Sequence, residues 1–275
     1  MTGKKILVIG GGFGGVATAR TCRRLLGQEH EVTLVNRNRK TFLCGSLPLL
    51  IVGEREASGI SRSLGSLANR GIRFIESEVR EINLHSKTVS TSVCELKYDY
   101  LVVALGAEYD TNAVPHSEDA YSFYDLKNAK RLRRKLRYFR EGTIVIGISS
   151  TPYKCPPAPF ETAMLLDWYF TQQNLRKQIS IHIFSPEPSA MPITGPQAGE
   201  RILKTLRRKG IETHFNIGAA GVDREGKQMV LSNGNLMNGD IIITIPKHQA
   251  SPVVKKAGLT GKSGWIDVSP ETLET

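Results

Sequence analysis

The chain has 275 residues, 40% of them hydrophobic, and a formal net charge of +11 at pH 7. That length fits one large or two ordinary domains with a sizeable core, so a disordered chain is excluded. The longest apolar runs are far shorter than the roughly 18 residues that suggest a membrane span. The first strand-like segment follows Met1 so closely that a secretory leader is not expected, and a cytoplasmic location is predicted. Four scattered cysteines without metal-ligand spacing predict neither a metal site nor a disulfide framework.

The first part of the chain alternates strand and helix patterns. Residues 6–9 predict a buried strand, 14–26 a helix that ends at Gly27, and 32–35 a second strand. A βαβ unit of this kind predicts a parallel sheet. We then expect, in order, a connecting loop over 37–60, a helix over 64–70, a strand over 72–75, a three-stranded meander over 79–98, a strand over 101–104 and a linker over 110–117.

Basic residues concentrate in residues 127–140, between apolar residues at spacings that predict one buried helical stripe. The stripe consists of Leu126, Leu132, Leu136 and Phe139. The cationic face is either a solvated surface or a surface attracted to anionic membranes. Nucleic acid is not an expected partner.

The strand and helix pattern then restarts. Strands are expected over 143–146, 179–184, 211–215 and 241–245, helices over 160–170 and 198–209, and a hairpin turn at Asn233-Gly234. His182 lies inside one of these strands and is interpreted as a packed core residue. The fold class predicted is α/β, with two Rossmann-like dinucleotide-binding domains. The expected boundaries are 1–112 for the first domain, 113–246 for the second, and 247–275 for a return toward the first.

A complete G-x-G-x-x-G motif follows the first strand and opens the first helix. Gly10 permits the tight turn, Gly12 lets the backbone approach a pyrophosphate, and Gly15 lets helix and strand pack closely. The acidic residue usual at the end of the second strand is Asn36, which can still bond a ribose hydroxyl. The remaining predicted cofactor contacts of this region are Phe13, Gly14 and Arg37. The Arg37 cation either favours an extra phosphate, as in NADP, or is a solvated loop residue.

The equivalent loop in the second domain has prolines and a cysteine in place of glycines. Its sequence is Ser-Ser-Thr-Pro-Tyr-Lys-Cys-Pro-Pro-Ala-Pro over residues 149–159. Prolines fix φ and remove amide donors, so this loop is not suited to binding a pyrophosphate. Because Cys155 lies beside Lys154 and just ahead of a helix, we expect a rigidly held thiol with a lowered pKa. Glu161 either transfers a proton at sulfur or stabilises the helix dipole.

The order of glycine loop, Asn36, meander and a strand ending at Ala104-Leu105-Gly106 resembles the glutathione-reductase-like flavoproteins with two dinucleotide domains. The resemblance implies that FAD is the cofactor of the first domain. It also implies FAD contacts at Ala104, Leu105 and Gly106, and an adenine contact at the backbone of Val79.

The segment Tyr-Lys-Cys-Pro-Pro-Ala-Pro-Phe-Glu over residues 153–161 resembles the sulfide:quinone oxidoreductase and flavocytochrome c sulfide dehydrogenase branch. This resemblance implies oxidation of sulfide or small sulfur species to sulfur or polysulfide through Cys155, with a quinone or a cytochrome as acceptor. It also implies that the chain ends before the family's last FAD contact, partner cysteine and C-terminal amphipathic segment. Cys44 is then the best substitute partner for Cys155, whereas Cys22 and Cys94 are interpreted as structural.

Two alternatives remain open at this point. One is a type II NADH dehydrogenase-like protein, which would need a nicotinamide site in the second domain. The other is a non-catalytic flavin-binding or cytochrome-docking module. A peripheral position on the inner face of the membrane is compatible with the basic helix, and the sequence predicts no oligomeric state.

Overall fold

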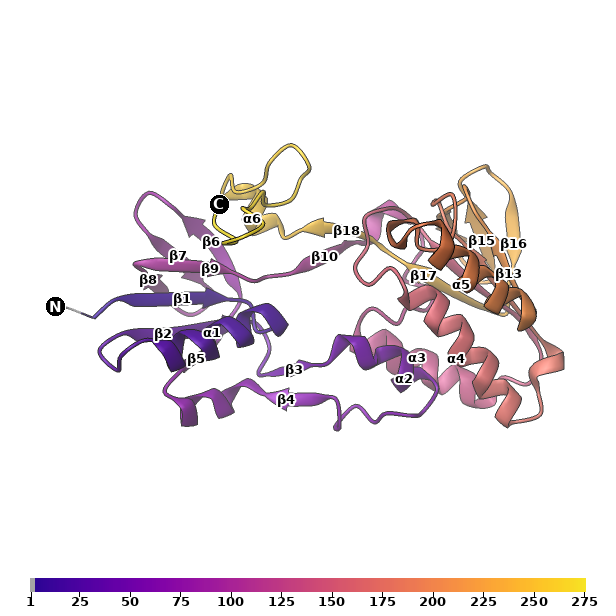
Figure 1. Ribbon diagram of the computed structural model, residues 1–275, viewed down its shortest axis with the longest axis horizontal. Helices are drawn as coiled ribbons and strands as arrows, with labels where there is room; N and C mark the ends of the chain where they lie inside the picture. The colour runs from indigo at the N-terminus through magenta and orange to yellow at the C-terminus, as the bar shows by residue number, and fades with distance from the viewer. Residues whose placement is uncertain (1–2) are drawn as a thin grey trace. The chain divides into compact units, whose positions relative to one another are not determined.

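Two four-stranded parallel sheets organise the computed structural model, which describes residues 3–275 (Figure 1). The chain divides into two units. Unit 1 consists of the described residues up to 42 together with 61–108 and 249–275, and unit 2 consists of 43–60 and 109–248.

The sheet of unit 1 has the strand order β5-β2-β1-β9, with every pair parallel. Residues 6–9 of the central strand β1 (Lys5–Ile9) are all buried, as expected for a strand that is covered on both faces. Val8 is aligned with Leu34 on one side and with Val102 on the other. Both Val8 and Ile9 are fully buried, and burial of such a side chain stabilises the fold by about 1.5–3 kcal/mol.

The remaining elements of unit 1 surround this sheet. Gly15 and Ala19 form part of the buried face of α1, which packs on β1 and β2. The elements are α1 (Phe13–Leu25), β2 (Glu31–Asn36), β3 (Lys40–Phe42), β4 (Ser61–Ser63), the 3-10 helix η2 (Leu64–Arg70), β5 (Arg73–Glu76), the meander β6 (Val79–Asn83), β7 (Thr88–Thr91) and β8 (Glu95–Lys97), β9 (Tyr100–Val103) and α6 (Pro252–Lys256).

The sheet of unit 2 repeats this arrangement in the order β13-β12-β11-β17, again with every pair parallel. A three-stranded antiparallel sheet, β14-β15-β16, packs against it through a shared apolar core that includes Val145, Ile242 and Met229. The elements are η1 (Cys44–Ser46), α2 (Leu47–Ile51), η3 (Thr111–Ala113), α3 (Leu126–Tyr138), β11 (Gly142–Ile148), α4 (Ala158–Gln172), η4 (Arg176–Gln178), β12 (Ile179–Phe184), η5 (Pro192–Thr194), α5 (Pro196–Arg208), β13 (Ile211–His214), β14 (Ala219–Val222), β15 (Gln228–Leu231), β16 (Leu236–Asn238) and β17 (Ile241–Ile245).

Two paired strands carry the chain between the units: β10 (Ala107–Asp110) and β18 (Lys247–Ala250). The linker predicted over 110–117 is therefore partly wrong, because its first residue ends a strand and 111–113 form a 3-10 turn. The strand arises where residues far apart in sequence meet, so local composition does not reveal it.

The basic helix α3 has most of the buried stripe that its sequence predicts, although Leu126 is only partly buried and buried Phe139 follows the helix. Leu132 and Leu136 are fully buried, and the Asp125 side chain caps the helix by accepting a 2.8 Å bond from the Asn128 amide. The helix packs against α2 within unit 2. The segment 43–60, expected as part of the first domain, belongs instead to unit 2, because its short apolar helix α2 packs on α3 and α4.

Other differences concern the ends and types of helices. The helix expected from residue 160 begins at Ala158, since a proline at the start of a helix needs no amide partner. Residues 64–70 form a 3-10 helix rather than an α-helix, and Gly71 closes it in the left-handed conformation.

Candidate functional site

The glycine loop, residues 10–15, follows β1 at the carboxyl end of the unit 1 sheet. Gly10 has φ +105°, and a Cβ placed there would lie 2.2 Å from the carbonyl oxygen of Ala104. A Cβ on Gly15 would lie 1.8 Å from the carbonyl oxygen of Gly10. These two glycines are required by the close packing of backbone on backbone, as the motif predicts.

Gly12 differs from both, because a Cβ built on it would have no heavy atom within 4 Å. The space above Gly12 is therefore open, and α1 begins directly after it with exposed Phe13. The first amides of a helix have no intrahelical acceptor and point toward such a space. The loop accordingly fits the pyrophosphate of a dinucleotide such as FAD.

Asn36 holds the glycine loop from the end of β2. Its Oδ1 accepts a bond of 2.8 Å from the Gly11 amide, and its Nδ2 donates to the Asn38 carbonyl, also at 2.8 Å. The acceptor of this side chain thus serves the glycine loop and the donor serves the turn after β2, a use that the sequence analysis did not foresee.

The other predicted cofactor contacts of unit 1 lie in different surroundings. Ala104 and Leu105 contribute backbone atoms to the wall behind Gly10, and the methyl group of Ala104 is the nearest atom to a Cβ built on Gly14. Gly106 (φ +72°) has open space around its Cβ position, and Arg37 is exposed just after β2. Val79 begins the meander and packs against the core cluster of Leu7, Ile9 and Val35.

The cysteine loop, residues 149–157, follows β11 at the same topological position in unit 2. Cys155 has φ +59°, a left-handed conformation that is unusual for a non-glycine residue, and its side chain is exposed. Its carbonyl accepts a 2.9 Å bond from the Ala158 amide at the start of α4. The Cys155 thiol is therefore held at a helix N-terminus, as the sequence predicts.

The expected low pKa of this thiol is wrong in direction. Partial desolvation raises the Cys155 pKa above its usual value although the side chain is exposed, and the nearby Glu161 carboxylate and Cys44 raise it further. The Ala158 backbone amide and the Lys154 charge act in the opposite direction without compensating. The sequence showed the helix and the cation, but desolvation depends on tertiary packing.

Cys44 lies in the electrostatic neighbourhood of Cys155, within the same unit. It is exposed at the first residue of η1, and its charge affects the titration of Tyr109, Lys154 and Cys155. Burial lowers the Lys154 pKa, while Cys44, Asp125 and Cys155 raise it, in that order. The two thiols predicted as a pair thus share one cation, Lys154.

An aromatic cluster of Tyr109, Tyr124 and His248 lies beside this cation. The Lys154 Nζ is 5.0 Å from the Tyr109 ring centroid, and the His248 ring meets Tyr109 and Tyr124 edge-on at centroid distances of 5.0 and 5.3 Å. His248 Nδ1 lies 2.8 Å from the Pro246 carbonyl oxygen, which can only accept, so Nδ1 carries the proton. Within residues 3–275, the buried Nε2 has no hydrogen-bond partner.

Sequence reasoning missed these three residues. Tyr109 and His248 come from the paired strands β10 and β18, and no local sequence pattern predicts these strands. The one available signal was the run Phe123-Tyr124 just ahead of the basic helix.

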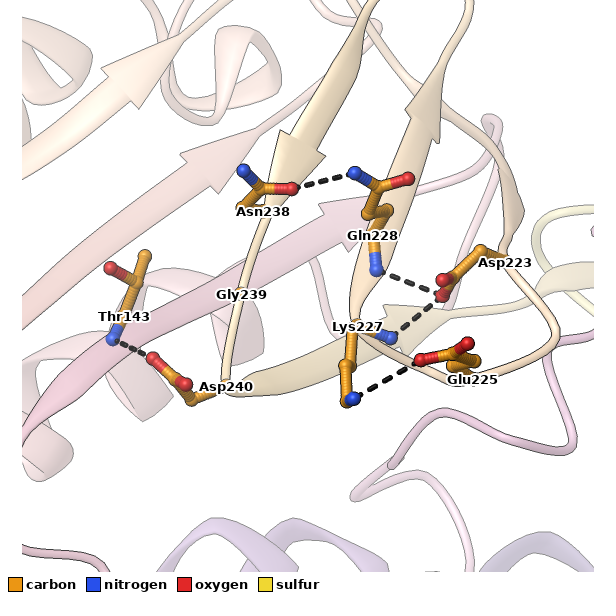
Figure 2. Close-up of a pocket in the computed structure, with 8 residues that line it drawn as sticks. All are labelled: Thr143, Asp223, Glu225, Lys227, Gln228, Asn238, Gly239 and Asp240. Carbon is orange, nitrogen blue, oxygen red and sulfur yellow. Dashed lines mark hydrogen bonds and ion pairs between the residues drawn. The ribbon is translucent and has the colours of Figure 1, made fainter.

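A separate pocket lies in a different region of unit 2. It has a volume of about 450 Å³ and lies near the turn before β15 and the start of β11 (Figure 2). Its carboxylates already serve the fold: Asp223 accepts from the Lys227 and Gln228 amides at 2.7 and 2.9 Å, and Asp240 accepts from the Thr143 amide at 2.8 Å (Figure 2). No thiol lines this pocket, so its chemistry is unrelated to the cysteine loop.

His182 lies with Glu212 and His214 on one face of β12 and β13. Its Nδ1 is 3.5 Å from His214 Nε2 and 3.5 Å from Glu212 Oε2. The two imidazole planes are 19° apart and their centroids lie 5.8 Å apart in a stacked arrangement. The ligand atoms of the three side chains lie within 4.8 Å of one another, a spacing that could hold a metal ion. The partial burial of His182 agrees with its interpretation as a packed residue.

Comparison with known proteins finds sulfide:quinone oxidoreductases that are similar to nearly the whole chain. The mitochondrial sulfide:quinone oxidoreductase of Mus musculus is 24% identical over 98% of this chain and 62% of its own length. The type II NADH:quinone oxidoreductase of Staphylococcus haemolyticus is 29% identical but covers only 48% of this chain and 34% of its own. The X-ray structure of the sulfide:quinone oxidoreductase from Aquifex aeolicus superposes with a TM-score of 0.85 and 25% identity, over 95% of this chain and 63% of that one.

The resemblance predicted from the cysteine loop is thereby confirmed, and the chain spans a little over three fifths of the length of these sulfide:quinone oxidoreductases. The family model for pyridine nucleotide-disulphide oxidoreductases matches residues 4–275. The chain therefore belongs to the pyridine nucleotide-disulphide oxidoreductase family.

Proposed function

We propose that this chain is an FAD-dependent oxidoreductase that oxidises sulfide and passes the electrons to a quinone. The observation that carries the proposal is the exposed thiol of Cys155, held ahead of α4 at the position where unit 2 would otherwise have a nucleotide loop. Cys44 of the same unit interacts electrostatically with Cys155 and with Lys154. The named relatives that match nearly the full chain are sulfide:quinone oxidoreductases, which supports the same reaction.

The cofactor would be held by the glycine loop of unit 1. Gly12 and the first amides of α1 would receive the pyrophosphate, and Ala104, Leu105 and Gly106 would form the adjoining wall. When bound, FAD would supply a two-electron acceptor whose reduced form a quinone can oxidise. All other steps of the proposed reaction are assigned to residues of the chain itself.

In the oxidised protein, Cys44 and Cys155 would form a disulfide. Hydrosulfide attacks one of its sulfurs, a new S–S bond forms there, and the S–S bond between the two cysteines breaks. The products are a persulfide on the attacked cysteine and a thiolate on the other, which retains the electron pair. The Lys154 cation, whose titration both thiols affect, would stabilise that thiolate.

Glu161 has a narrower role in this scheme. Its carboxylate raises the Cys155 pKa, so it favours the protonated thiol. Because Glu161 lies in the first turn of α4, it also stabilises that helix, and both effects follow from the same position. We propose that it returns a proton to sulfur at the end of the cycle.

A peripheral attachment to an anionic membrane surface forms part of the same proposal. Arg133 is paired with Glu56, and Arg131 donates to the carbonyls of residues 118–120. The exposed cations of α3 are Lys127, Lys130, Arg134, Lys135 and Arg137, and exposed Arg140 follows the helix. Within residues 3–275, no helix is both long and apolar enough to cross a bilayer. Sedimentation with anionic vesicles that weakens as salt is raised would support this attachment, and equal sedimentation with neutral vesicles would oppose it.

Visible absorption of the protein loaded with FAD tests the main proposal. Sulfide should bleach the flavin band far faster than NADH does, because the cysteine loop offers no glycine cradle to a nicotinamide cofactor. Faster bleaching by NADH would favour the NADH:quinone oxidoreductase function of the partial relative. Absence of bleaching by either donor would favour a non-catalytic flavin-binding module.

A further inference from the structure

Cys155 adopts a backbone conformation that its own chemistry does not favour. Its φ of +59° places it in the left-handed region, where a Cβ crowds the backbone. The residue also precedes Pro156, whose ring disfavours the right-handed helical alternative. A conformation of this kind persists only where surrounding contacts hold it.

Three consecutive carbonyls around Cys155 are hydrogen-bonded. The Tyr124 hydroxyl donates to the Lys154 carbonyl at 3.0 Å, and the Ala158 amide donates to the Cys155 carbonyl at 2.9 Å. The Tyr153 hydroxyl lies 3.4 Å from the Pro156 carbonyl and shares its proton with Glu187 Oε2 at 3.1 Å. The peptide group before Cys155 is thus attached to the Tyr124 hydroxyl, and the Pro156–Pro157 peptide group, one position further along, to the Tyr153 hydroxyl.

Both tyrosines are themselves fixed. Tyr124 and Tyr153 are 5% and 6% exposed, and the Tyr124 carbonyl accepts a 2.8 Å bond from the Tyr109 hydroxyl. Burial raises the pKa of both phenols, so the hydroxyls remain protonated donors across the neutral range. The prolines at 156 and 157 fix their own φ angles, and Pro156 restricts Cys155 without selecting its left-handed conformation.

We propose that Tyr124 and Tyr153 are positioning residues, which hold Cys155 in the left-handed conformation and so fix the direction in which its Sγ is presented. The use of this arrangement rests on the proposed function, in which the sulfur of Cys155 must meet that of Cys44. A disulfide tolerates only a narrow range of Cβ–Cβ distances and torsions, so a small rotation of the Lys154–Cys155 peptide would disfavour it.

The test replaces each hydroxyl by hydrogen and retains the ring. Tyr124→Phe, Tyr153→Phe and the double variant are compared with Tyr138→Phe, since Tyr138 is exposed on α3 of the same unit. The first measurement is the equilibrium constant of the Cys44–Cys155 disulfide in glutathione buffers, read by mass spectrometry of the full chain. The second is the pH profile of iodoacetamide alkylation at Cys155, with exposed Cys94 of unit 1 as internal control.

Loss of one hydrogen bond should lower the disulfide constant by about fivefold, which corresponds to roughly 1 kcal/mol. The alkylation midpoint of Cys155 should move toward the ordinary value of about 8.5 as the freed loop becomes solvated. Tyr138→Phe should change neither quantity, and Cys94 should react equally in every variant. The Tyr153→Phe effect should be the smaller, because its proton is shared with Glu187.

An unchanged disulfide constant and an unchanged alkylation profile in the folded double variant would overturn the proposal. If the double variant does not fold, Tyr153→Phe alone decides by the same two measurements. Parallel changes at Cys94 would also overturn it, because they would show general destabilisation. Neither measurement uses sulfide, so a wild-type protein that fails to reduce flavin with sulfide refutes the proposed function and leaves the positioning role standing.

Discussion

The glycine loop and the cysteine loop occupy the same place in two sheets of the same topology. The glycine loop follows β1 and the cysteine loop follows β11, each the third strand in the order of its sheet, and each loop leads into a helix. In the first loop the required feature is the absence of Cβ atoms, at Gly10 and Gly15 for packing and at Gly12 for open space. In the second it is a fixed Cβ, on Cys155, with prolines around it. One scaffold can therefore bind phosphates or present a thiol, according to which backbone amides the loop leaves free.

Among the variants that test this comparison, replacement of the Cys155 thiol should have the largest effect, which is on flavin reduction by sulfide. Cys155→Ser should retain its fold and flavin but lose sulfide-driven bleaching, because a hydroxyl neither ionises at neutral pH nor forms a disulfide. Flavin absorbance under anaerobic sulfide measures the loss. Cys94→Ser, at an exposed turn of unit 1, is the matched control and should bleach at the wild-type rate. Wild-type bleaching in Cys155→Ser would mean that the cysteine loop has no redox role.

Variants of the glycine loop can separate its role in binding flavin from its role in stabilising the fold. Gly12→Val adds atoms only to open space, so the flavin-free protein should keep its free energy of unfolding within about 0.5 kcal/mol. Its flavin content should nevertheless fall at least about tenfold, since a loss of 1.4 kcal/mol of binding suffices for that.

Gly15→Val is the contrasting variant in the same loop. Its Cβ would overlap the Gly10 carbonyl, so overpacking should destabilise the protein by about 1–3 kcal/mol or more even without flavin. Denaturant titration and flavin absorbance measure the two effects. Unchanged flavin content in Gly12→Val would show that the cofactor lies elsewhere.

The smallest predicted effect concerns pH. Because burial raises the Cys155 pKa, its thiolate should appear, and alkylation should accelerate, only above the ordinary cysteine value of about 8.5. A group whose folded pKa is raised stabilises the fold below its unfolded pKa, and that contribution is lost as pH rises above it. Peptide-resolved alkylation with iodoacetamide between pH 6 and 10 measures the midpoint for Cys155, and a midpoint below 8 would restore the original expectation of an activated thiol.

Much of this organisation could be predicted from particular residues. The buried run of β1 and the motif that follows it predicted a parallel sheet with a dinucleotide loop, because both signals depend on neighbours in the chain. The meander from Val79, the hairpin at Asn233-Gly234 and the buried stripe of α3 followed from local periodicity and turn chemistry in the same way.

The sequence by itself determined the position of the Cys155 thiol ahead of α4, since prolines and a following helix restrict the backbone wherever they occur. Only the tertiary structure decided the environment of that thiol. Desolvation reversed the direction of the pKa shift expected for Cys155. The strands β10 and β18 brought Tyr109 and His248, the first and last residues of the segment 109–248, to Lys154. The physical reason is that electrostatic and packing energies depend on distance in space, to which residues remote in sequence contribute as much as neighbours do.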